Sequence, residues 1–276
     1  MGLKFGSKGV VRSMKQDELQ YGMPLTKRQR WQGFGYYALM IIGSLLAYFP
    51  ALVIIIEEQI NQTGYSRFSA VQYALLSLIQ PLVLALIALL AGQFFFQKVG
   101  LHAVIYERSA YAWALFKDSL SSVLLLGLEL GIGIGLADLF FSAFIPELTE
   151  MMPSVQSLLA GVFYGGVIEE IMLRFGLMTT IIYFLSRSSS CLKSWHYWLA
   201  ISIVAIVFAL GHLPMTLQLF EMTPFVWLRL LLLNGVAGMM TGYFYWRFTL
   251  ESAILCHMMA HVGMYAVQLL LAVIEK

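Results

Sequence analysis

The sequence predicts an all-α protein, a polytopic bundle of about seven and at most eight helices that cross a membrane. Of its 276 residues, 60% are hydrophobic and only 12% are charged, whereas soluble proteins average about 25% charged residues. The mean hydropathy is +0.79. So few charges cannot cover a soluble surface, and the apolar residues occur in runs of about 20, the length that crosses the hydrocarbon core as a helix.

Seven apolar runs predict the individual membrane helices. In chain order they are Gly35–Ile56, Ala70–Phe96, Ser119–Phe144, Val155–Leu185, Trp198–Phe220, Phe225–Phe248 and Ala253–Ile274. The stretch Leu101–Lys117 is amphipathic, so we expect it to lie at the membrane interface. Glycines four residues apart, at 131 and 135 and at 238 and 242, predict helices that approach closely.

Residues 1–33 predict a basic cytoplasmic arm, ahead of a single membrane domain over residues 34–276. The arm holds seven Lys and Arg residues between Lys4 and Arg30, opposed by two acids. Lys and Arg are also richer in every second loop, on the side of the arm, a distribution that places the N-terminus in the cytoplasm. Seven spans would then place the C-terminus outside. In a bacterium the protein would lie in the plasma membrane, and its net charge of +2 does not indicate nucleic-acid binding.

An acidic pair lies in the middle of the fourth run. Glu170 and Arg174 are four residues apart, so on a helix they share a face and can form an ion pair. Glu169 projects about 100° away from Glu170 and would remain free. Charges at membrane depth cost on the order of 3 kcal/mol each. An ion pair that only holds helices together would explain Glu170 and Arg174 but not Glu169, which favours a functional site.

Three histidines lie in later runs. His212 is flanked by Gly211 and Pro214, which predict a kink that opens backbone groups and leaves room for water. His257 and His261 are four residues apart on one helical face. Zinc proteases use this spacing for two ligands, but the glutamate that follows the first histidine in their motif is absent here.

These clusters provide the groups needed to activate water and to stabilise an oxyanion. Two mechanisms remain open at this point: a metal-independent one, and one in which Zn²⁺ is bound by Glu169, His212, His257 and His261. Two other function classes also remain open. The same groups could relay protons or bind a cation in a transporter or channel, or they could be structural in a membrane scaffold without enzymatic activity.

The order of the motifs resembles the CPBP family, also called the Abi or CAAX-protease-like family, whose best-known members are the type II CAAX prenyl endopeptidases. The resemblance covers Pro153–Tyr265 and rests on Glu169-Glu170-x-x-x-Arg174, Phe208-x-x-x-His212 and His257-x-x-x-His261. It implies an intramembrane endopeptidase with its catalytic cavity among the last four helices. Glu170 and Arg174 would complete the first motif.

The resemblance also implies roles for single residues. Glu169 matches the catalytic glutamate, His212 would help it to activate water, and His257 would lie on the oxyanion side. The family commonly has Asn where this chain has His261. Because histidine can donate a hydrogen bond or bind a metal, this difference leaves both mechanisms open.

The expected reaction is hydrolysis of a peptide bond in a peptide or membrane-anchored protein, within the lipid bilayer and without nucleic acid. Prenylation of the substrate is left open. His257 lies near the start of the last run, on the side assigned to the cytoplasm. We therefore expect the cavity to open toward the cytoplasm.

Overall fold

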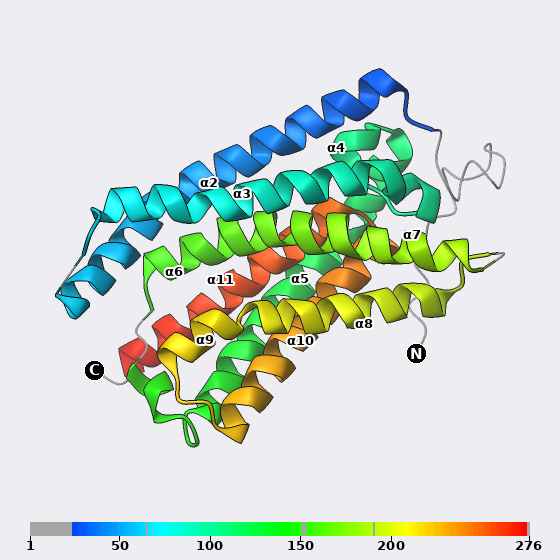
Figure 1. Ribbon diagram of the computed structural model, residues 1–276. Helices are drawn as coiled ribbons and strands as arrows, with labels where there is room; N and C mark the ends of the chain where they lie inside the picture. The colour runs from blue at the N-terminus through cyan, green and yellow to red at the C-terminus, as the bar shows by residue number, and fades with distance from the viewer. Residues whose placement is uncertain (1–23, 65, 151–152, 190, 275–276) are drawn as a thin grey trace.

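The computed structural model describes residues 24–64, 66–150, 153–189 and 191–274. All of its regular elements are helices, which lie lengthwise beside one another (Figure 1). Six helical spans are long and apolar enough to cross a membrane: α2 (Lys27–Thr63), α3 (Ala70–Phe95) with η2 (Phe96–Val99), α5 (Ala110–Phe141), α8 (Ser194–Gly211) with α9 (Leu213–Leu219), α10 (Pro224–Arg247) and α11 (Leu250–Ile274). The predicted all-α polytopic bundle is confirmed.

A seventh span corresponds to the predicted fourth run. Its consecutive segments are α6 (Val155–Leu159), η4 (Ala160–Glu169), η5 (Ile171–Met178) and α7 (Thr179–Arg187). The backbone stays in the right-handed helical region at each junction, so these segments form one continuous rod. Its middle, η4 and η5, is π-helical, a rare conformation that is frequent at functional sites. With seven spans, the described chain begins and ends at opposite ends of the bundle (Figure 1).

The first span begins earlier than predicted. Helix α2 starts at Lys27 because Thr26 caps it: the Thr26 hydroxyl accepts a hydrogen bond from the backbone N–H of Gln29, and the Gln29 side chain accepts one from the backbone N–H of Thr26. The last part of the predicted arm, from Lys27 onward, is therefore helical. Residues 1–23 of the arm lie outside the described residues.

Residues 101–117, which we expected at the membrane interface, do not form one continuous helix. Helix α5 already begins at Ala110, where the Ser109 hydroxyl caps it. The residues before α5 lie at the end of the bundle and include the short helix α4 (Val104–Glu107), in which Glu107 is buried. Its carboxylate can be buried because it accepts hydrogen bonds from His102 Nδ1 and from the backbone N–H of Ala103, each at 3.0 Å.

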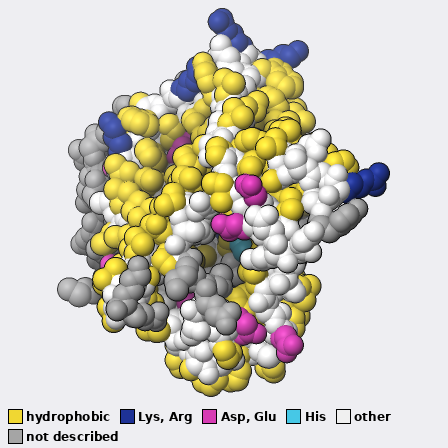
Figure 2. Space-filling model, turned by 90° about the vertical axis from the view of Figure 1, so that its left-hand side faces the viewer, with side chains coloured by type: hydrophobic (Ala, Val, Ile, Leu, Met, Phe, Trp, Pro, Cys, Tyr) yellow, Lys and Arg dark blue, Asp and Glu magenta, His cyan; other side chains and the backbone are white. Residues whose placement is uncertain are grey.

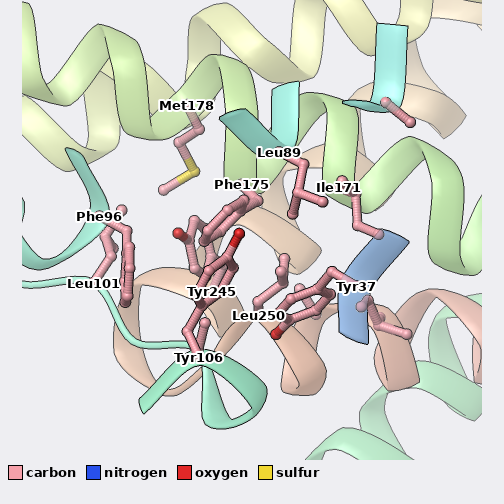
Figure 3. Close-up of a cluster of buried hydrophobic side chains, with 14 of the residues drawn as sticks. Tyr37, Leu89, Phe96, Leu101, Tyr106, Ile171, Phe175, Met178, Tyr245 and Leu250 are labelled. Atoms are coloured by element: carbon pink, nitrogen blue, oxygen red, sulfur yellow. The ribbon is translucent and has the colours of Figure 1, made fainter. Parts of the chain in front are cut away.

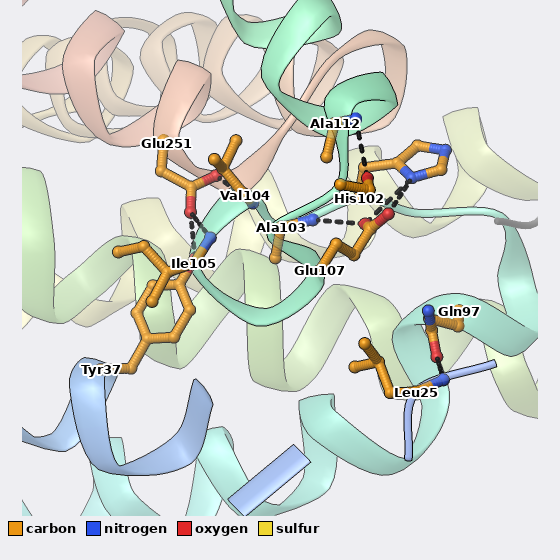
Figure 4. Close-up of polar contacts among 11 residues, drawn as sticks. Leu25, Tyr37, Gln97, His102, Ala103, Val104, Ile105, Glu107, Ala112 and Glu251 are labelled. Atoms are coloured by element: carbon orange, nitrogen blue, oxygen red, sulfur yellow. Dashed lines mark hydrogen bonds and ion pairs between the residues drawn. The ribbon is translucent and has the colours of Figure 1, made fainter. Parts of the chain in front are cut away.

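Helix α4 is fastened to the beginning of α11 by one carboxylate (Figure 4). Glu251 accepts hydrogen bonds from the backbone N–H groups of Val104 and Ile105, each at 3.0 Å, and from the hydroxyl of Tyr37. Because α4 has only one turn, these bonds to α2 and α11 replace those that a longer helix would make within itself.

A layer of buried rings lies against α4 (Figure 3). The ring of Tyr106 stacks on Tyr37 and Phe175, with centroids 5.2 and 5.3 Å apart, and contacts Phe96 at 5.5 Å. Tyr245, also fully buried, bonds to Thr179. Burial raises the pKa of the Tyr106 phenol well above its usual value. We call residues 101–107 and these rings the plug, because together they fill one end of the bundle.

The glycine pairs confirm the predicted close packing. A Cβ at Gly131 would lie 1.9 Å from the carbonyl oxygen of Ala260, so α5 and α11 touch through their backbones. At the second pair, Gly238 and Gly242, α10 also lies close to α8: a Cβ at Gly238 would lie 2.9 Å from the Cα of Ala205. These contacts hold the last helices together around the rod.

Candidate active site

The predicted ion pair on the fourth span is present and fully buried. Nη1 of Arg174 lies 3.0 Å from Oε1 of Glu170. Nη2 of Arg174 donates to the carbonyl oxygen of Gly238 at 3.2 Å, and the guanidinium lies over the ring of Phe208, 4.9 Å from its centroid. Since an uncompensated buried charge is costly, these contacts explain how the pair is tolerated inside the bundle.

A chain of polar contacts continues from this pair to the histidines of α11. His257 Nδ1 lies 2.8 Å from Glu170 Oε1, and His257 Nε2 lies 3.2 Å from His261 Nε2. A carboxylate only accepts hydrogen bonds, so Nδ1 of His257 carries a proton. The Nε2 of a neutral His257 then accepts, and His261 donates from its Nε2. The polar contacts thus link Arg174 to Glu170, Glu170 to His257, and His257 to His261.

Two glycines of the rod make room for these rings. A Cβ at Gly161 would lie 2.3 Å from Cγ of His261, and one at Gly165 would lie 2.9 Å from Nε2 of the same ring. Sequence reasoning missed both positions, although the spacing Gly161-x-x-x-Gly165 is the same small-residue signal that was noted elsewhere in the chain.

His212 lies at the predicted break in the fifth span. Helix α8 ends at Gly211 and α9 begins at Leu213, with Pro214 in its first turn. His212 Nδ1 lies 2.9 Å from the carbonyl oxygen of Phe208. The carbonyl can only accept, so Nδ1 carries the proton and Nε2 keeps a free lone pair, the form that a general base requires.

Glu169 lies on a different face of the rod from Glu170. It is half-buried and makes no hydrogen bond or ion pair with a residue that the structure describes. Glu169 and His212 line the same lateral groove of about 530 Å³, between α3 and α8. The structure thus brings a free carboxylate near a correctly protonated imidazole.

A second cavity lies on the other side of His212. It has a volume of about 230 Å³ and is lined by His212, His257 and His261. His261 and Arg229 also line an adjoining cavity of about 320 Å³, which extends to the start of α6 and the last turns of α11. Figure 2 views the molecule from this end, and histidine atoms are visible in it near Asp and Glu side chains.

The expectation that the cavity opens toward the cytoplasm stays a prediction. The cavities that hold His261 extend toward the end of the bundle where α9 and α11 finish, whereas the plug fills the end where α2 and α11 begin. His257 lies seven residues into α11, beneath this plug. His257 is close in sequence to the start of α11, but the packed residues 101–107 lie between His257 and the end of the bundle where α11 begins.

Two further acids of the third span have different surroundings. Asp138 accepts two hydrogen bonds from Arg229, at 2.7 and 2.9 Å, and both residues line the mouth of the cavity. Glu129 is exposed on α5 and lines none of the cavities described above.

The side chains do not fit a metal site. Among the described residues, no group of three or more His, Cys, Asp or Glu is arranged to hold a metal ion. His257 uses Nδ1 for Glu170 and faces His261 with Nε2, while His212 uses Nδ1 for a carbonyl. Glu169, His212, His257 and His261 thus do not form such a group in the described part of the chain, and no step below involves a metal.

One family model matches the chain: type II CAAX prenyl endopeptidase Rce1-like, over residues 152–263. No curated protein and no solved structure matches. The matched segment covers less than half of the chain, but it extends from the start of the rod to the first half of α11 and contains all six predicted site residues. This agrees with the resemblance in the sequence: residues 152–263 are similar to the type II CAAX prenyl endopeptidases.

Proposed function

We propose that the protein is an intramembrane endopeptidase in which Glu169 and His212 activate water. The observation that carries the proposal is the separation of the two neighbouring acids. Glu170 is held by Arg174 and His257, whereas Glu169 has no such partner and lines a groove with His212. A purely structural ion pair would not need the second acid.

The reaction needs one water and two proton transfers. The Glu169 carboxylate takes one proton from the water, and Nε2 of His212 accepts a hydrogen bond from the other. The water oxygen then bonds to the carbonyl carbon of the scissile peptide. As the C–N bond breaks, Glu169 gives its proton to the leaving nitrogen. General acid–base assistance of this kind contributes about 10²–10⁴-fold to the rate.

The oxyanion of the intermediate would be stabilised by the histidines of α11. His261 Nε2–H, which faces His257 in the resting site, can donate to a substrate oxygen that approaches between the two rings. If His257 takes up a second proton, it becomes another donor, and the contact with the Glu170 carboxylate stabilises the resulting imidazolium. Glu170 and Arg174 are thus positioning residues.

At the family level the substrate is a peptide or protein in a lipid environment. We propose that it is a membrane-associated polypeptide. Whether a prenyl group contributes to recognition can be tested by comparing matched peptides with and without the lipid.

The test compares the wild-type protein with Glu169→Gln and Glu129→Gln in proteoliposomes. The probes are a fluorogenic peptide library and the membrane proteins of the expression host, with new N-termini mapped by mass spectrometry. Glu169→Gln should lower cleavage by about 10²–10⁴-fold. Glu129→Gln removes an exposed acid of α5 that lies outside the cavities, so it should cleave like the wild type. Equal cleavage by Glu169→Gln and wild type would refute the role of Glu169.

A further inference from the structure

The lateral groove that contains Glu169 holds further polar side chains. The rod lies between α3 and α8 (Figure 1), and most of the residues that line the groove there are apolar. Besides Glu169 and His212, its polar lining residues are Gln80, Tyr164 and Thr180. The Thr180 hydroxyl already donates to a backbone carbonyl of the rod, at 2.7 Å. Tyr164 is therefore the residue of the rod that brings an additional hydroxyl to the groove of Glu169.

The π-helical backbone turns Tyr164 and Glu169 toward similar directions. Both residues belong to η4 and are five positions apart. In an α-helix, two such residues would point about 140° away from each other. A π-helix is hydrogen-bonded between residues five apart, so they lie about one turn from each other and point in much more similar directions. This backbone explains how a phenol and an acid so spaced in the sequence line one groove.

The ring of Tyr164 is held in place while its hydroxyl is free. The ring packs against Tyr48 of α2, with centroids 5.7 Å apart, and the residue is half-buried. Within the described part of the chain, the Tyr164 hydroxyl makes no hydrogen bond. A phenol carries its proton at neutral pH and can donate it to an acceptor. A fixed ring with an unused O–H is the kind of preorganised donor that stabilises charge developing in a transition state.

We propose that Tyr164 is a further catalytic residue, whose hydroxyl donates a hydrogen bond to the oxyanion of the tetrahedral intermediate. The proposal rests on the proposed roles of Glu169 and His212. When the water oxygen bonds to the scissile carbonyl carbon, the carbonyl oxygen becomes negative and accepts this hydrogen bond. No proton is transferred from Tyr164, and the oxygen becomes a carbonyl again as the C–N bond breaks.

Tyr164 lies on the same side of His212 as the proposed base. His212 lines both the groove and the cavity of about 230 Å³, whereas His257 and His261 line only the cavity and Glu169 only the groove. A substrate carbonyl attacked from Glu169 thus has a donor in the groove itself, in addition to the donor from α11.

The substitution Tyr164→Phe isolates the hydroxyl, because the ring and its packing against Tyr48 remain. Tyr48→Phe is the matched control: it removes the hydroxyl of the other ring in this pair, and Tyr48 lines none of the cavities described above. Both variants should keep the Tm of the wild type in detergent. Their kcat and KM are measured in proteoliposomes with a peptide whose cleavage site has been mapped, beside Glu169→Gln.

We expect Tyr164→Phe to lower kcat by about 10²–10³-fold, with KM within about threefold of the wild type. Tyr48→Phe should cleave like the wild type. A fall in kcat of less than about tenfold in Tyr164→Phe, or an equal fall in Tyr48→Phe, would overturn the catalytic role of Tyr164.

A binding measurement tests the same donor without turnover. The probes are a peptide phosphinate, whose tetrahedral anionic centre imitates the oxyanion, and the uncharged peptide of the same sequence. Both are titrated into Glu169→Gln with and without Tyr164→Phe. Loss of the hydroxyl should weaken binding of the phosphinate at least about tenfold and leave that of the peptide unchanged. Equal weakening of both probes, or of neither, would show that Tyr164 does not act on the oxyanion.

The two proposals can fail separately. If Glu169→Gln cleaves like the wild type, the proposed function fails, and the role of Tyr164 fails with it. If Glu169→Gln is inactive while Tyr164→Phe cleaves like the wild type, only the role of Tyr164 is refuted.

Discussion

Replacing Gly161 with alanine tests the fit between the rod and the catalytic histidines. The new Cβ would lie 2.3 Å from Cγ and Nδ1 of His261, whereas unstrained contacts between such atoms are about 3.5–4.0 Å. The ring would have to move by more than about 1 Å, which would disrupt the 3.2 Å contact between His261 and His257. Overpacking of this kind costs about 2 kcal/mol.

Part of this overpacking cost is offset by the higher helix propensity of alanine. Alanine in place of glycine in a helix gains roughly 0.5–1 kcal/mol, so the net cost is about 1–1.5 kcal/mol. At roughly 2–4 °C per kcal/mol, the Tm of Gly161→Ala in detergent should fall by about 2–6 °C. Gly133→Ala is the control, because a Cβ at Gly133 meets nothing within 4 Å. Its Tm should stay equal or rise.

Removing the His261 ring should remove the destabilisation that Gly161→Ala causes. In a His261→Ala background, Gly161→Ala should cost almost nothing, with a coupling energy of about 1–2 kcal/mol between the two positions. If Gly161→Ala and Gly133→Ala shift the Tm alike, or if the penalty persists without the His261 ring, the inferred packing of His261 against the rod is wrong.

Substitutions at two further positions probe the site and the plug. His261→Asn keeps an N–H donor, so cleavage should stay within about tenfold of the wild type. His261→Leu removes the donor and should lower kcat by about 10²–10³-fold. Equal cleavage rates for the two variants would contradict a donor role of His261. Glu251→Ala leaves two backbone N–H groups and the Tyr37 hydroxyl without their acceptor, so it should cost about 2–4 kcal/mol and speed deuterium exchange at Val104 and Ile105. Glu57→Ala, which removes an exposed acid, is the control. Unchanged deuterium exchange at Val104 and Ile105 in Glu251→Ala would show that α4 does not depend on the Glu251 carboxylate.

The sequence was informative where local geometry decides the contact. The four-residue spacing of Glu170 and Arg174 predicted their ion pair, because helical neighbours meet at that spacing in any surroundings. Likewise, Gly211 and Pro214 predicted the break at His212. The seven apolar runs correspond to the seven spans for the same reason, since length and apolarity are local properties.

The open side of the cavity depends on contacts that no local pattern contains. The polar residues of 101–107 suggested a helix at the interface, but His102 satisfies Glu107 inside the fold, and Glu251, nearly 150 positions further along the chain, holds the backbone of α4. The π-helical backbone around Glu169 is a similar case, since no local pattern in the sequence predicted it. The catalytic roles of the six site residues remain predictions.

The plug has an electrical consequence. Water that filled the cavity down to His257, seven residues from the start of α11, would be separated from the solution at the plugged end by about 10 Å of protein. A potential of 100 mV is worth about 2.3 kcal/mol per elementary charge that crosses it. Over so thin a layer the electric field would be steeper than across lipid, and the carboxylate of Glu251 lies within it. We infer that the plug separates the water of the cavity from the solution at its own end of the bundle.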